Sequence, residues 1–235
     1  MDISQLMFPK FVQESRHKSV LLVGPTKTCK TSFLFQIAVS LSAGSNDPVI
    51  FISSQKVDKK PLNVHTMAEV DARRAKNITL VYLKTYADLI KYVANIFVQN
   101  ESLSGILIDG VDLFLANITE NDGTYKECLL RLFALLNDTA AHFTTLNGTT
   151  CYAAATCDHK EDNKVEEATF FGLGLHFFDD VLRTEVHNIP YRTVNFLLTD
   201  SSDRKFHYYI EDGQIFLDKI TEKQCVVKQS LPPDS

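Results

Sequence analysis

The residues from Gly24 to Thr31 have the types and spacing of a phosphate-binding loop. Its pattern is G-x-x-x-x-G-K-[ST], in which backbone N–H groups surround a phosphate, the lysine reaches the terminal phosphates and the hydroxyl holds Mg²⁺. Gly24, Lys30 and Thr31 fit this pattern, whereas Cys29 stands where the second glycine belongs. A Cβ atom there adds bulk to a backbone that must approach phosphate closely and that can require a conformation favouring glycine. The segment therefore predicts an ATP site of weak affinity.

A second chemical signal is the carboxylate of Asp109, which follows the apolar run 105–108. A buried strand that ends in aspartate is the pattern that holds Mg²⁺ through water in ATPases of this kind. Because ligands lie at the carboxyl ends of the strands in such a sheet, the loop and Asp109 should converge. The predicted cofactor-binding residues are Gly24, Pro25, Thr26, Lys27, Thr28, Cys29, Lys30, Thr31 and Asp109, with Thr31 and Asp109 as the Mg²⁺ ligands.

The elements that must position these residues alternate along the chain. Apolar runs predict buried strands at 19–23, 49–52, 78–83, 105–109 and 150–156, and apolar periodicity predicts helices at 32–43, 85–98 and 124–146. Short strands with hairpin turns follow at 181–187, 194–199, 206–210 and 214–218. This order predicts an α/β fold, a phosphate-loop core with a mostly parallel sheet flanked by helices and a C-terminal antiparallel β extension. We expect a short N-terminal segment over 1–18, a single domain over 19–218 and a flexible tail over 219–235.

Composition argues against several other classes of protein. The chain has 235 residues, of which 45% are hydrophobic, and no apolar run reaches the length of a membrane span. Residues 1–18 lack the basic start and apolar centre of a signal peptide, so we expect a protein of the cytoplasm or nucleus. Five cysteines without a C-x-x-C pair indicate neither a disulfide framework nor a zinc site. We expect Cys151, Cys157 and His159 to pack in the core.

The distribution of charge singles out one segment as a candidate nucleic-acid contact, although a net charge of −5 argues against binding by bulk electrostatics. Between residues 56 and 76, six basic side chains outnumber three acidic ones. The candidate contacts to single-stranded DNA in this segment are Lys59, Lys60, Arg73 and Arg74. A solvated loop is the alternative, because no aromatic side chain is interleaved among these charges. The segment 158–167 holds five acids against two lysines and should not bind phosphates.

In its motifs and their order the chain resembles the RecA-like recombinases, the fold of the strand-exchange ATPases and their paralogues. It is most similar to the small paralogues that serve as the SWIM-type zinc-finger-associated ATPase subunit of the Shu complex. The closest resemblance lies in Leu107-Ile108-Asp109-Gly110 and in the segment 135–143, which reads Leu-Leu-Asn-Asp-Thr-Ala-Ala-His-Phe. The phosphate loop is generic to a very large superfamily, whereas segment 135–143 is distinctive.

This resemblance implies a nuclear subunit of a recombinase-paralogue complex that acts in homologous recombination. Its implied partners are a SWIM-type zinc-finger protein, the recombinase and other recombinase paralogues, and it would support the recombinase filament on single-stranded DNA. The resemblance also implies ATP and Mg²⁺ as cofactors and a weak, DNA-stimulated ATPase activity.

The chain departs from the active recombinases at two positions. Gln55 stands in place of the glutamate that polarises the attacking water, and Thr156 in place of the glutamine that senses the γ-phosphate. Gln55 is the candidate catalytic residue, but its amide cannot act as a base. A pseudo-ATPase that serves as a protein-interaction scaffold, without nucleotide or DNA activity, is therefore the main alternative.

Two other nucleotide-binding classes fit less well. A GTPase is disfavoured because the sequence Asn-Lys-Val-Glu at 163–166 lacks the aspartate of the guanine-reading motif and does not directly follow a strand. A small-molecule kinase is disfavoured because terminal strands replace the lid helices that such enzymes need.

Two apolar segments could serve either packing or a partner. Phe35-Gln36-Ile37-Ala38 matches the F-x-x-A pattern by which recombinase protomers dock, but its place on the helix after the loop favours core packing. The helix at 124–146 carries large apolar residues around much of its circumference. We expect a subunit interface there, with Leu130 and Phe133 facing outward, unless both of its faces are buried within the chain.

Overall fold

The computed structural model describes residues 18–57, 59–67, 71–159, 164–186, 191–198 and 204–222. The predictions for the N-terminal segment before Lys18 and for the tail beyond Glu222 lie outside the described residues, as does the side chain of Arg73. The division into segment, domain and tail stays a prediction. In the part of the chain that is described, no helix is long and apolar enough to cross a membrane.

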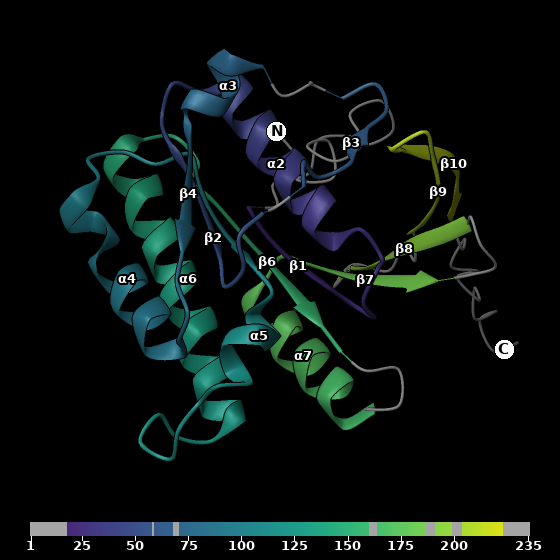
Figure 1. The fold of residues 1–235 in the computed structure, drawn as a ribbon. Helices are drawn as coiled ribbons and strands as arrows, with labels where there is room; N and C mark the ends of the chain where they lie inside the picture. Colours follow the sequence, from purple (N-terminus) through teal and green to yellow (C-terminus); the bar gives the residue numbers. More distant parts are fainter. Residues whose placement is uncertain are drawn as a thin grey trace, which may run out of the picture.

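One sheet runs through the molecule, and its strand order is β3-β10-β9-β8-β7-β1-β6-β5-β2-β4 (Figure 1). The strands are β1 (Ser19–Gly24), β2 (Val49–Ser53), β3 (Asn63–Val64), β4 (Ile78–Tyr82), β5 (Gly105–Asp109), β6 (Tyr152–Asp158), β7 (Asp180–Val186), β8 (Tyr191–Leu198), β9 (Arg204–Glu211) and β10 (Gln214–Glu222). The neighbours from β4 to β7 pair in parallel, whereas β7 to β10 pair antiparallel. This arrangement confirms the predicted fold class.

The helices cover the two faces of the parallel part of the sheet (Figure 1). They are α2 (Lys30–Gly44), α3 (Ala72–Lys76), α4 (Tyr86–Gln99), α5 (Val111–Leu115), α6 (Tyr125–Asn147) and α7 (Lys164–Phe177). Successive strand side chains point to opposite faces, so each parallel strand feeds two apolar cores. In β1, Val20 and Leu22 join the core under α2, whereas Leu21 and Val23 join the core under α4, α6 and α7.

The structure corrects the predicted interface on α6. Phe133 is fully buried rather than facing outward, and its ring packs edge-on against those of Phe177 and Phe178. Leu130 is half-buried. The helix packs between α4 on one side and α7 on the other, and its large apolar residues up to Phe143 are buried or half-buried (Figure 1). Internal packing therefore explains these apolar residues, whereas Leu146 in the last turn is 60% exposed.

Four elements fall where no regular structure was predicted. β3 and α3 interrupt the polar segment 53–76, α5 follows Asp109 directly, and α7 occupies part of the predicted acidic loop. α3 and α5 are single turns of five residues, too short to give a readable apolar period. The other predicted elements are present with their ends shifted by a few residues. The expected core packing of Cys151 and Cys157 is confirmed, and His159 is also buried.

Candidate nucleotide-binding site

The loop from Gly24 to Thr31 joins β1 to α2, at the carboxyl end of the strand and the amino end of the helix. Cys29 is the residue before α2 and has the left-handed backbone conformation, with φ 61° and ψ 19°. This region of backbone conformation favours glycine. The backbone at Cys29 therefore has the conformation that was expected for the glycine of the motif. The loop keeps the conformation of a glycine position while bearing a cysteine.

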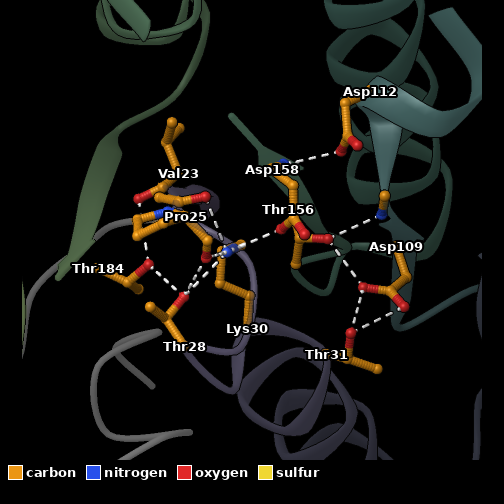
Figure 2. Close-up of polar contacts among 12 residues, drawn as sticks. Val23, Pro25, Thr28, Lys30, Thr31, Asp109, Asp112, Thr156, Asp158 and Thr184 are labelled. Carbon is orange, nitrogen blue, oxygen red and sulfur yellow. Dashed lines mark hydrogen bonds and ion pairs between the residues drawn. The ribbon is translucent and has the colours of Figure 1, made fainter. Parts of the chain in front are cut away.

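Lys30 is folded into the loop and is only 4% exposed. Its Nζ donates to the carbonyl oxygens of Gly24 at 3.0 Å and Pro25 at 2.6 Å. The same Nζ donates to Thr28 Oγ1 at 2.9 Å and lies 2.8 Å from Asp158 Oδ1 (Figure 2). Lys30 is thus paired with the carboxylate of Asp158, at the end of β6, at the position where the motif would bind a phosphate.

Thr31 and Asp109 meet as the two sequence motifs predicted. Thr31 Oγ1 lies 3.0 Å from Asp109 Oδ1 and 3.1 Å from Oδ2, so one hydroxyl bridges the two motifs (Figure 2). Thr156 Oγ1 donates to Asp109 Oδ1 at 2.8 Å and accepts from the Gly110 N–H at 2.8 Å. Burial raises the pKa of Asp109, although the hydrogen bonds from Thr156 and Thr31 act in the opposite direction. The charge of Lys30 also lowers this pKa, but burial has the larger effect.

Two further acids complete this edge of the sheet. Asp112, in the first turn of α5, accepts a hydrogen bond from the Asp158 backbone N–H at 2.7 Å (Figure 2). Burial raises the pKa of Asp112 to about 6. The sequence predicted that Asp158 belongs to an acidic loop that does not bind phosphates. Because β6 extends to Asp158, this side chain instead lies beside Lys30.

A cleft of about 480 Å³ opens beside the Thr31–Asp109 contact. Its lining includes the candidate catalytic residue Gln55 and the two candidate DNA contacts Lys59 and Lys60. All three side chains are exposed. The structure therefore brings Gln55 to the predicted nucleotide site and places the two lysines at its rim.

The candidate DNA contacts do not gather on one surface. Arg74 lines a separate hollow with residues 42–46, at the other end of α2 from the cleft. Ser32 lines the cleft and Ser42 the hollow, and ten helical residues span about 15 Å. Arg74 also lies 3.7 Å from the carboxylate of Asp71. Lys59 and Lys60 are therefore the pair that the structure keeps together near the site.

Three residues at the site were not predicted from the sequence. Thr184 in β7 and Tyr208 in β9 both reach Thr28, and Asp112 reaches β6. The sequence Asp-Gly-Val-Asp at 109–112 offered a signal for Asp112, since both acids lie at the carboxyl end of β5. No local pattern marks Thr184 or Tyr208, because their contacts depend on strand pairing.

The described residues have a RecA-like fold. The RadB recombinase structure superposes with a TM-score of 0.59 at 11% identity, covering 86% of this chain and 90% of that one. A KaiC-like protein from the hyperthermophilic archaeon Pyrococcus horikoshii OT3 superposes with a TM-score of 0.52 at 17% identity, covering 86% and 89%. At these identities the likeness shows the fold alone.

The sequence adds a more specific relative. No protein-family model matches the chain. It is 29% identical to the human ATPase SWSAP1 over 126 residues, which are 53% of this chain and 52% of the relative. The chain thus matches about half the length of this relative. These findings confirm the predicted resemblance to RecA-like recombinase paralogues of the SWIM-associated type.

Proposed function

We propose that this chain is a subunit of a recombinase-paralogue complex in homologous recombination and that it binds Mg-ATP weakly. The observation that carries the nucleotide part is the convergence of Lys30, Thr31 and Asp109 at one edge of the sheet. Backbone N–H groups at the amino end of a helix favour an anion, and the loop leads directly into α2. The named relative is itself an ATPase, which supports the same assignment.

The residues at this edge fit a magnesium ion. Thr31 and Asp109 supply a hydroxyl and a carboxylate, the oxygen ligands that Mg²⁺ prefers. The raised pKa of Asp109 reflects a burial cost that a nearby cation would offset. When bound, the ion supplies charge neutralisation for the phosphates. Thr156 orients Asp109 for that task through its 2.8 Å hydrogen bond.

We propose that hydrolysis is slow. Gln55 lines the cleft but its amide can orient a water molecule without accepting its proton. Thr156 is 2% exposed, and both its donor and an acceptor site are used by Asp109 and Gly110. Because its hydroxyl already makes these two hydrogen bonds, we infer that Thr156 holds Asp109 and Gly110 in place and does not contact a γ-phosphate.

Thermal unfolding with and without Mg-ATP tests the nucleotide assignment. A ligand at a hundredfold excess over its Kd adds about 2.7 kcal/mol to the free energy of unfolding. We expect this gain for the wild type and its loss in Lys30→Ala, while Lys91→Ala, on the exposed surface of α4, serves as the matched control. Equal nucleotide shifts in wild type and Lys30→Ala would remove the loop from consideration.

The recombination part of the proposal rests on the similarity to SWSAP1 and on the RecA-like fold. We propose a nuclear protein whose partners are a SWIM-type zinc-finger protein, the recombinase and other recombinase paralogues. Co-expression with a SWIM-type protein tests it directly. Recovery of a stable complex of equal stoichiometry is the expected result, and purification of both chains apart under the same conditions would contradict it.

We propose that Lys59 and Lys60 contact single-stranded DNA. Both are exposed basic side chains at the rim of the cleft, and phosphate contacts of this kind weaken steeply with salt. Fluorescence anisotropy at low salt should show that reversing both lysines to glutamate abolishes binding. Arg74→Glu, in the separate hollow at the other end of α2, is the matched control for the single reversal Lys59→Glu and should retain most of the affinity. Equal losses in both variants would assign the effect to net charge.

A pseudo-ATPase scaffold is the second candidate function. The observation that favours it is the ion pair of Lys30 with Asp158, which already provides the lysine with an anion. This reading predicts that Lys30→Ala, which should lose nucleotide binding, still forms the complex with a SWIM-type protein and still supports repair in cells. Loss of repair in a variant that keeps the complex would favour the nucleotide-dependent function.

A further inference from the structure

The antiparallel extension reaches the phosphate loop through buried hydroxyl groups. Tyr208, on β9, donates from its hydroxyl to the Thr28 carbonyl oxygen at 2.7 Å. Thr184, on β7, places its Oγ1 2.7 Å from Thr28 Oγ1 (Figure 2). All three side chains are 0% exposed. The middle of the loop is therefore bound to two strands on one side of β1, its neighbour β7 and the more distant β9.

These contacts continue to the lysine of the site. Thr28 Oγ1 donates to the Pro25 carbonyl at 2.9 Å and accepts from Lys30 Nζ at 2.9 Å. A hydroxyl has one proton, so when Thr28 gives its proton to Pro25, Thr184 is the donor in the 2.7 Å contact between the two threonines. In this arrangement Thr184 does not donate to the Val23 carbonyl, which lies 3.4 Å away. The hydroxyl of Thr28 is then fully used, and it holds Lys30 in place from one side.

Close packing against β7 and β9 restricts the conformation of the loop. A Cβ built on Gly24 would lie 2.0 Å from Thr184 Oγ1 and 2.4 Å from the Thr184 carbonyl oxygen, so β7 presses directly on the start of the loop. The Tyr208 ring also packs edge-on against Phe33 of α2, with 5.1 Å between the ring centroids. Strand β9 thus fixes both the loop and the first turns of the helix that follows it.

We infer that Tyr208 and Thr184 are positioning residues for phosphate binding at this loop. In a trans peptide the C=O and N–H groups point in opposite directions. Because Tyr208 holds the Thr28 carbonyl, the Cys29 N–H of the same peptide is directed to the opposite side, away from β9. Cys29 has a left-handed backbone that a cysteine adopts only when its surroundings enforce it. The Tyr208 hydroxyl is one such constraint, and this role rests on the proposed nucleotide function.

The test compares Tyr208→Phe with Tyr209→Phe, the adjacent tyrosine, which is half-buried and stacks on Phe216. Mg-ATP affinity is measured at a temperature where circular dichroism shows both variants fully folded. Tyr208→Phe should raise the Kd about tenfold, which corresponds to about 1.4 kcal/mol. Tyr209→Phe should leave the Kd unchanged. Thr184→Val should act like Tyr208→Phe, whereas Thr184→Ser keeps the hydroxyl and should restore affinity.

A second measurement does not require nucleotide. The rate of Cys29 alkylation by iodoacetamide, in a Cys225→Ser background, should rise in Tyr208→Phe because the loop is less constrained. An unchanged Kd in Tyr208→Phe overturns the inference. If the wild type itself binds no Mg-ATP, the proposed function fails, and an unchanged alkylation rate then refutes the positioning role as well.

Discussion

Glycine at position 29 should give a more stable protein than alanine at the same position, the reverse of the order seen at most sites. Cys29 has φ 61° and ψ 19°, where the Cβ of any L-residue approaches the following carbonyl oxygen. Both Cys29→Gly and Cys29→Ala remove the sulfur atom. The comparison of these two variants therefore isolates the effect of Cβ on the backbone.

The magnitude follows from two opposing contributions. An L-residue in the left-handed region costs about 1–2 kcal/mol relative to glycine. The greater freedom of glycine in the unfolded chain returns about 0.4–1 kcal/mol of that difference. The expected advantage of Cys29→Gly over Cys29→Ala is therefore about 0.8 kcal/mol, at the centre of a range of about 0–1.6 kcal/mol. For a chain of this size it corresponds to a melting temperature higher by about 1–4 °C.

Urea unfolding followed by circular dichroism measures this difference, and Ala141→Gly provides the control. Ala141 is exposed in the middle of α6, where glycine should cost about 1 kcal/mol. Opposite signs at positions 29 and 141 are expected. Mg-ATP should also bind more tightly to Cys29→Gly, because the loop loses the bulk of Cβ. If Cys29→Gly is less stable than Cys29→Ala, the account of strain in the loop is wrong.

Three further outcomes are expected. Asp158→Asn should tighten Mg-ATP binding severalfold in a titration, because Lys30 loses the carboxylate that lies 2.8 Å from its Nζ. Weaker binding in this variant would instead show that Asp158 contributes to nucleotide binding. Asp112→Asn should flatten the pH dependence of unfolding. Burial raises the pKa of Asp112 in the folded protein to about 6, above the ordinary aspartate value of about 3.9. Its contribution to stability is therefore full below pH 4 and falls as the pH rises to about 6, by on the order of 2–3 kcal/mol. An unchanged pH profile in the variant would contradict this cause. Phe133→Ala should cost about 3–5 kcal/mol in urea unfolding because it opens a cavity between α6 and the end of α7, and a loss below 1 kcal/mol would argue for an exposed side chain.

Local patterns were sufficient for the parallel core and for the centre of the site. The parallel strands β1, β2, β4, β5 and β6 are short, mostly apolar runs, which can be recognised without knowing their neighbours. The two-residue strand β3 is too short to be recognised in this way. The meeting of Thr31 and Asp109 followed from one rule, that ligands lie at the carboxyl ends of parallel strands. The error over α6 has a related origin. An apolar circumference indicates burial, but the sequence does not say whether the covering surface belongs to the same chain.

The contacts that finish the site depend on strand pairing over long sequence separations. Tyr208 is 180 residues from Thr28, and Thr184 is 156 residues from it. Thr184 reaches the loop because β7 pairs in parallel with β1, with Arg183 beside Val23. Tyr208 lies two strands further on and is set by the antiparallel pairing of β9 with β8. A shift of one residue in either ladder would turn these hydroxyls to the opposite face of the sheet. The register of the C-terminal extension therefore controls whether the loop is held, which is why no local motif in the loop could reveal it.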